Sequence, residues 1–287
     1  MVMRCKFWVL YILILFAFTF FNSCSKSNYQ TSIKTEPVFY PAPPDTARIQ
    51  FLTRYGNSVD FTGGQKKFKT FVAGQEDALP ILKPYGLALL FNKLYIADAA
   101  IGGLHVVDLQ KNTFDYFIPG GRGKLKLPIN CFVDAGGDLY VTDLVRKQVV
   151  IFNEKFEYRG EIGGDSIFKP ADVVVAGDTV LVTDPLNNRI NAYNKSTRQL
   201  MFTFPEGASA GDENWLYNPL NLCVAKGKIY VTDFGDSKVK IFNMKGEYIS
   251  AVGSYGAGLS QFVRPKGIAV DKEENIYVVD AGFENVQ

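Results

Sequence analysis

A four-residue phrase recurs five times in this chain of 287 residues and limits its fold more than any other feature. Each copy ends in aspartate, and the copies are Tyr95–Asp98, Tyr140–Asp143, Leu181–Asp184, Tyr230–Asp233 and Tyr277–Asp280. The aspartates are 45, 41, 49 and 47 residues apart. A proline comes 14 or 15 residues before each aspartate and an aliphatic residue six after it: Pro84 and Leu104, Pro128 and Val149, Pro170 and Ile190, Pro219 and Val239, Pro265 and Val286. Markers held in constant phase indicate a repeated structural unit.

Each repeat contains four short runs of apolar, β-branched and aromatic residues separated by Gly or Asn turns. The recurring phrase is the second run, and Gly267–Asp271, Val239–Asn243 and Glu247–Gly253 are examples of the first, third and fourth. Four antiparallel strands in a repeat of 40 to 50 residues are typical of a propeller blade. The sequence therefore predicts an all-β fold, a β-propeller of four-stranded antiparallel blades.

The phrase also carries a family resemblance. The stretch Asp184–Ile190 resembles the Asp-x-x-Asn-x-Arg-Ile signature of the NHL repeat, and Pro265–Asp271 is similar to the opening strand of that repeat. The resemblance covers roughly residues 80–287 and implies a six-bladed propeller. Because Gln287 falls in the third strand of the fifth repeat, we expect a C-terminally truncated propeller with about four and a half blades present.

Two segments before the first full repeat also carry structural signals. Arg48–Gly56 resembles a fourth strand, which in closed propellers often completes the last blade. Residues 57–79 place Phe68, Phe71 and Val72 at helical spacing, so we expect an inserted helix there.

The N-terminus has the pattern of an export signal. Arg4 and Lys6 precede an apolar run of 15 residues, Phe7–Phe21. As a helix this run spans about 22 Å, too short for the roughly 30 Å hydrocarbon core of a bilayer. The residues before Cys24 resemble a bacterial lipobox, which implies a lipid on that cysteine; an uncleaved anchor is the alternative. We expect a lipoprotein signal peptide over 1–23, a tether over 24–46 and the NHL-type propeller over 47–287.

This reading implies an extracytoplasmic, lipid-anchored protein of the bacterial cell envelope. Without residues 1–23 the chain has 29 basic and 29 acidic residues, a balance that gives no support to a nucleic-acid partner. Cys131 and Cys223 stand in non-adjacent repeats, so we expect two buried thiols and no disulfide. The expected partners are the membrane, through the lipid, and an unidentified protein or small-molecule ligand.

Candidate binding residues are found where the repeats differ. Two positions after each proline stand Gly86, Asn130, Asp172, Asn221 and Gly267. This slot begins the innermost strand, so Asn130, Asp172 and Asn221 are candidate ligand-binding residues at the channel mouth; turn capping is the alternative. One position before the proline, Lys83, Lys169 and Arg264 form a candidate basic rim together with Arg122, Lys124 and Lys126. A solvated face is the alternative for the rim.

The sequence indicates no catalytic residue and no metal site. The repeated aspartates are expected to accept backbone N–H bonds in the turn that follows each of them. His105 is the only histidine and is predicted to be a half-buried strand residue, which argues against zinc or Ser-His-Asp chemistry. We therefore predict a non-enzymatic binding or scaffold propeller without a cofactor. The alternative is a Ca²⁺-dependent hydrolase or lactonase of the six-bladed class, which would use the Asn130, Asp172 and Asn221 slot.

Overall fold

The computed structural model describes residues 38–40, 44, 49–62, 78–164 and 168–287. The chain divides into two units, Met1–Arg54 and Tyr55–Gln287. The expected signal peptide, Cys24 and most of the expected tether lie outside the described residues. Among the described residues, no helix combines the length and apolar character needed to cross a bilayer.

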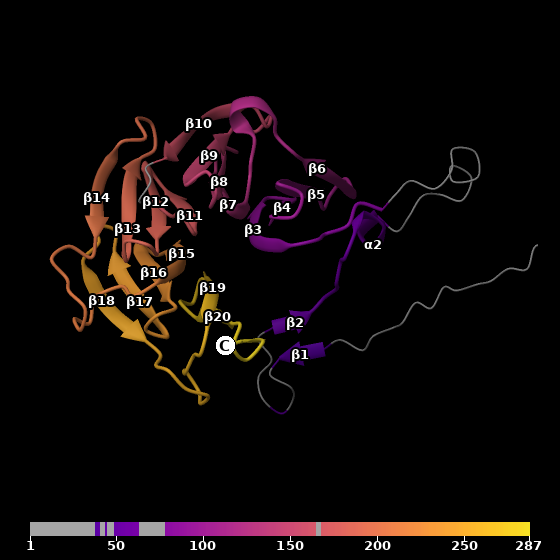
Figure 1. Cartoon of the computed structure of the whole chain (residues 1–287). Helices are drawn as coiled ribbons and strands as arrows, with labels where there is room; N and C mark the ends of the chain where they lie inside the picture. The colour runs from indigo at the N-terminus through magenta and orange to yellow at the C-terminus, as the bar shows by residue number, and fades with distance from the viewer. Residues whose placement is uncertain (1–37, 41–43, 45–48, 63–77, 165–167) are drawn as a thin grey trace, which may run out of the picture. The chain divides into compact units, whose positions relative to one another are not determined.

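The second unit contains the repeated sheets, which follow one another in chain order (Figure 1). Blade 1 has β3 Pro84–Leu90, β4 Lys93–Asp98, β5 Gly103–Asp108 and β6 Thr113–Phe117. Blade 2 has β7 Pro128–Val133, β8 Leu139–Asp143, β9 Gln148–Phe152 and β10 Tyr158–Gly163. Blade 3 has β11 Val173–Ala176, β12 Thr179–Asp184, β13 Arg189–Asn194 and β14 Leu200–Phe204. Blade 4 has β15 Pro219–Ala225, β16 Lys228–Asp233, β17 Lys238–Asn243 and β18 Tyr248–Val252. Blade 5 has three strands, β19 Pro265–Val270, β20 Ile276–Asp280 and β21 Asn285–Val286.

Every sheet is antiparallel with its strands in sequence order, so the chain is an all-β propeller with four-stranded blades, as predicted. The recurring phrase ends the second strand of each blade at its aspartate. In four blades the proline begins the first strand and lies opposite that aspartate; blade 3 differs, because β11 begins three residues after Pro170. The start of the first strand and the end of the second therefore lie at one end of each blade. We call this end of the propeller the linker end, because the linkers between blades arrive there.

The five aspartates connect each linker to its blade. All five are fully buried. Asp98 accepts backbone N–H bonds from Leu82 at 2.8 Å and Lys83 at 3.0 Å in the linker, and from Ala100 at 2.9 Å in the following turn. Asp143, Asp233 and Asp280 accept equivalent bonds from the linkers of their own blades, and Asp184 accepts one from Lys169. The predicted structural role is confirmed, and it includes the preceding linker as well as the following turn.

Neighbouring blades are joined along their first strands, which lie side by side from β3 to β7, β11, β15 and β19. The threonine before the aspartate makes a specific bond at three of these joints. Its hydroxyl donates to a backbone carbonyl of the next blade: Thr142 to Ala171 at 3.3 Å, Thr183 to Leu220 at 2.9 Å, and Thr232 to Lys266 at 2.7 Å. Apolar side chains from adjacent blades fill the space between the sheets.

The segments before blade 1 are short. In the first unit β1 Val38–Tyr40 pairs with β2 Ile49–Phe51, so the strand that we expected to complete the last blade has β1 as its partner. In the second unit α2 Ser58–Thr62 begins after Asn57, whose side chain accepts the amides of Val59 and Asp60. The helix expected around Phe68, Phe71 and Val72 falls outside the described residues.

Candidate functional site

The structure brings two of the three channel-slot residues together. The Asp172 side chain in blade 3 accepts a bond from Asn221 Nδ2 at 3.2 Å and from the Leu222 amide at 2.9 Å, both in blade 4. Its other oxygen accepts the Val173 amide at 2.8 Å. Burial raises the pKa of the Asp172 carboxyl to about 6, although these donors act in the opposite direction. One oxygen of Asp172 thus binds its own blade, and the other binds blade 4.

Asn130 is used locally. Its Oδ1 accepts the amide of the next residue, Cys131, at 2.9 Å, and 9% of the residue is exposed. A Cβ at Gly86 would lie 2.0 Å from Asn130 Oδ1, so blade 1 needs glycine at this slot to let blade 2 approach. The slot therefore contributes to blade packing at Gly86 and Asn130, and to a blade-to-blade bond at Asp172.

These residues do not fit a calcium site. Calcium takes six to eight oxygen ligands, preferably including carboxylates. Both Asp172 oxygens already accept N–H bonds, and Asn130 Oδ1 accepts the backbone amide of Cys131. Across the described part of the chain, no group of three His, Cys, Asp or Glu side chains is placed to hold a metal ion. We therefore derive no metal-dependent step from this slot.

The candidate rim residues are exposed but occupy three different blades. Lys83, Lys169 and Arg264 use their backbone amides to hold Asp98, Asp184 and Asp280 at 3.0, 3.2 and 2.9 Å. Their side chains share an equivalent position at the linker end of blades 1, 3 and 5.

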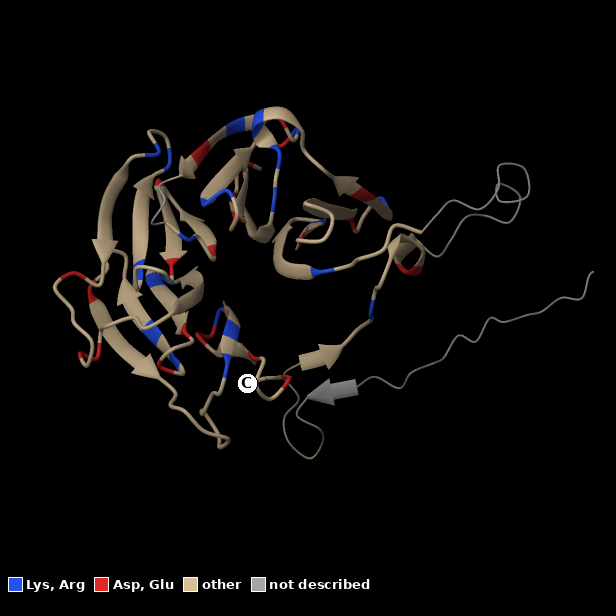
Figure 2. Ribbon diagram, viewed as in Figure 1, with Lys and Arg blue, Asp and Glu red and all other residues tan. Residues whose placement is uncertain are grey.

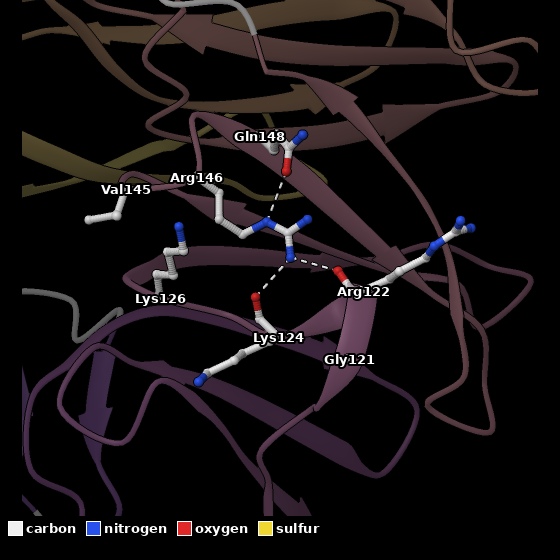
Figure 3. A pocket seen from close by; sticks show the side chains of 7 residues that line it. All are labelled: Gly121, Arg122, Lys124, Lys126, Val145, Arg146 and Gln148. Atoms are coloured by element: carbon white, nitrogen blue, oxygen red, sulfur yellow. Dashed lines mark hydrogen bonds between the residues drawn. The ribbon is translucent and has the colours of Figure 1, made fainter.

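The basic residues that line a common cavity belong mainly to the linker into blade 2. Arg122, Lys124 and Lys126 line an open cavity of about 450 Å³ with Arg146. Gly121, Val145 and Gln148 complete the lining, which comes from the β6–β7 linker, the β8–β9 loop and the start of β9 (Figure 3). No carboxylate is among the described residues that line it. Figure 2 shows the basic residues spaced along this linker. We call this cavity the basic pocket.

Arg146 holds the pocket together. Its Nη1 donates to the carbonyl oxygens of Arg122 and Lys124, each at 2.8 Å, and its Nε donates to Gln148 Oε1 at 2.8 Å (Figure 3). Leu125 also anchors the linker, because its side chain is buried in the core between blades 1 and 2. A Cβ at Gly123 would lie 2.7 Å from the Phe152 ring, so glycine lets the short helix η1 Gly121–Gly123 lie against the blade.

Sequence reasoning missed Arg146 and Gln148, although a signal existed. Three residues after the repeated aspartate stand Asn187 in blade 3 and Asp236 in blade 4, where blade 2 has Arg146. Asn187 Nδ2 donates to its own aspartate, Asp184, at 2.6 Å. Blades 1 and 5 have Ile101 and Phe283 at this position, so blade 2 is the repeat that carries a cation there, and that cation reaches the linker.

His105 was predicted to be half-buried, and this is wrong. It is fully buried, and its Nε2 lies 2.9 Å from Asp98 Oδ2, because the third strand passes directly beside the repeated aspartate. Blade 4 has a lysine at the same position. The fully buried Lys240 Nζ lies 3.3 Å from Asp233 and 2.8 Å from Asp236, and it also donates to the Trp215 carbonyl. Both side chains contribute to the packing of their own blade.

The expectation of two buried thiols is confirmed for Cys131 and is wrong for Cys223. Cys131 is buried, Cys223 is partly buried, and both are free. Burial raises the pKa of each thiol to about 12, so neither is a reactive thiolate at neutral pH.

Comparison with known protein families agrees with the propeller class. A domain-family model described as a 6-bladed beta-propeller, DUF5128, matches residues 210–286. The protein brain tumor of Drosophila melanogaster is 29% identical over 140 residues, which make up 47% of this chain and 13% of the fly protein. The chain therefore spans far less than two thirds of this curated relative. Both similarities support a propeller built from NHL-like repeats.

Solved structures show the same fold at low identity. A catalytically inactive virginiamycin B lyase from Staphylococcus aureus, with quinupristin, aligns with a TM-score of 0.55 and 13% identity. This alignment covers 71% of our chain and 65% of the lyase chain. A nidogen–laminin complex aligns with a TM-score of 0.50 and 17% identity, over 62% of our chain and 68% of the matched chain. At these identities the likeness concerns the fold alone, which is shared by an enzyme and by a protein in a complex.

Proposed function

We propose that this chain is a non-enzymatic binding protein of the bacterial cell envelope, with the propeller presenting a partner surface at its linker end. The lipid on Cys24 would hold the protein at the membrane on the extracytoplasmic side. The partner is a protein or a ligand with negative charge. The basic pocket carries this proposal, because it gathers four cationic side chains around one open cavity.

The use of the other polar groups favours binding over catalysis. Asp172 and Asn221 bond to each other and help to join blades 3 and 4. His105 is closed off from solvent beside Asp98. Exposed cations at the linker end include those of the basic pocket and of the rim, whereas the linker into blade 4 carries exposed carboxylates, among them Glu206, Asp212 and Glu213. The nidogen–laminin structure gives a precedent for a propeller in a protein complex.

The alternative is a hydrolase or lactonase that uses Ca²⁺ at the channel slot. The fold likeness to a lyase is compatible with an enzymatic propeller. Calorimetric titration of the full chain with Ca²⁺ separates the two functions. A tight, stoichiometric calcium site that Asp172→Ala removes would favour the enzyme.

The test of the binding proposal is quantitative cross-linking of the full chain in its own envelope. Lys124→Glu combined with Lys126→Glu should abolish the specific cross-linked species. The matched control is Lys93→Glu with Lys111→Glu, which reverses two exposed charges in the hairpins at the opposite end of blade 1. Equal cross-linking by wild type and both variants would refute the proposed surface.

A further inference from the structure

We infer that the basic pocket is a preorganised site for a multiply charged oxyanion, a phosphate or sulfate group carried on a larger molecule. This inference rests on the proposed function and deepens it by assigning the chemistry of the bound group. It also assigns Arg146 as a positioning residue for the site.

The pocket is held in shape before any ligand arrives. Arg146 uses its Nε–H and both N–H groups of Nη1 on protein acceptors. Those bonds hold the backbone that carries Arg122 and Lys124. The intervening residues of the linker, Gly123 and Leu125, are buried. The exposed side chains therefore alternate with anchored residues. A linker fixed in this way loses little conformational freedom on binding, which favours affinity.

The charge of the lining selects the kind of ligand. Arg122, Lys124, Lys126 and Arg146 bring four positive charges to one cavity whose described lining has no carboxylate. Several cations that line one cavity attract an anion with several negative oxygens more strongly than they attract a single carboxylate. Charge-assisted hydrogen bonds from Arg and Lys are the usual means of holding phosphate.

The size of the cavity indicates that the anionic group belongs to a larger molecule. About 450 Å³ lies within the range of small-molecule sites, roughly 300–1,000 Å³, and exceeds the volume of an isolated phosphate or sulfate ion. Val145 is 54% exposed and adds an apolar contact at the pocket wall. The cations would hold the anion, and the remaining volume would accommodate the group that carries it.

Calorimetry on the full chain with inorganic pyrophosphate, inorganic sulfate and glutarate tests this inference. Pyrophosphate or sulfate should bind one site with a Kd below about 1 mM, and glutarate should bind more weakly. Lys124→Gln and Lys126→Gln should each weaken binding about three- to tenfold and make it less sensitive to salt. Lys93→Gln and Lys111→Gln, at the opposite end of blade 1, should leave the affinity unchanged.

Arg146→Lys tests the positioning role, because it keeps the charge and removes the fork that holds two carbonyls. Affinity should fall about tenfold or more while its salt sensitivity stays that of the wild type. If this variant melts early, the Lys124 and Lys126 variants still decide the outcome. Failure of both phosphate and sulfate to bind, preferential binding of glutarate, or equal losses in the control variants would overturn the inference. Partner cross-linking that still depends on Lys124 and Lys126, without oxyanion binding, would retain the proposed function and reject only this inference.

Discussion

Replacing Thr183 by valine should destabilise the propeller by removing one hydroxyl that joins blade 3 to blade 4. Thr183 is fully buried; its Oγ1 accepts the Asp172 amide at 2.7 Å and donates to the Leu220 carbonyl at 2.9 Å. Valine keeps the shape and leaves both backbone groups without this partner. A buried polar group that loses its partner costs about 1–3 kcal/mol. Two such groups cost about 2–6 kcal/mol. Since burial of the added methyl group returns up to about 0.8 kcal/mol, we expect a net loss of about 1–5 kcal/mol.

Urea unfolding at constant m-value measures this loss, and two variants calibrate it. Thr183→Ser retains the hydroxyl and should recover most of the stability. Thr142→Val removes a longer bond from the Asn130 amide, at 3.0 Å, and longer bonds to two backbone carbonyls, both 3.3 Å, and should cost less. A loss below about 1 kcal/mol for Thr183→Val, or a larger loss for Thr142→Val, would show that the hydroxyl does not hold the joint.

Three further predictions concern buried charge and the lipid anchor. The pKa of Asp172 is raised from 3.8 to about 6 in the folded chain, so its burial penalty is complete above pH 6 and is relieved as the pH falls toward 4. The unfolding free energy of wild type relative to Asp172→Asn should therefore rise by up to about 3 kcal/mol between pH 7 and pH 4; a difference independent of pH would contradict this. Lys240→Met should cost about 3–5 kcal/mol in thermal or urea unfolding, because two carboxylates lose their buried partner, whereas Lys238→Met, at a partly exposed pair, should cost less than about 1 kcal/mol. Cys24→Ala should leave an unprocessed precursor that takes up no labelled palmitate, and unchanged labelling would reject the lipoprotein interpretation.

The blades were predictable because their determinants are local. A short, mainly apolar phrase ends in aspartate, a proline precedes the aspartate by 14 or 15 residues, and turn residues separate the runs. Strand pairing within a blade joins segments that are neighbours in the sequence, so periodicity and turn chemistry are sufficient to specify it. The structural role of the aspartates followed from the same reasoning, since the turn after each one is adjacent to it in the chain.

The binding site was only partly predictable. Arg122, Lys124 and Lys126 were identified as a basic group, but the residue that orders them, Arg146, lies in another loop of the same blade. The three residues predicted at the channel mouth do not form one site. Asp172 and Asn221 bond to each other across the joint between blades 3 and 4, while Asn130 accepts the amide of the next residue in its own strand. His105 was misjudged because strand alternation does not reveal that a repeated aspartate lies beside it.

The sequence by itself determined the repeat, the class of fold, the ends of the second strands and the neutrality of the chain outside its N-terminal segment. These properties depend on residue type and on spacing within about 50 residues. The tertiary structure decided which threonine hydroxyls reach the next blade, which polar groups are consumed in joining blades, and which cations surround a cavity. Those outcomes depend on the contact between successive sheets, where donors and acceptors 20 to 50 residues apart compete for the same partners.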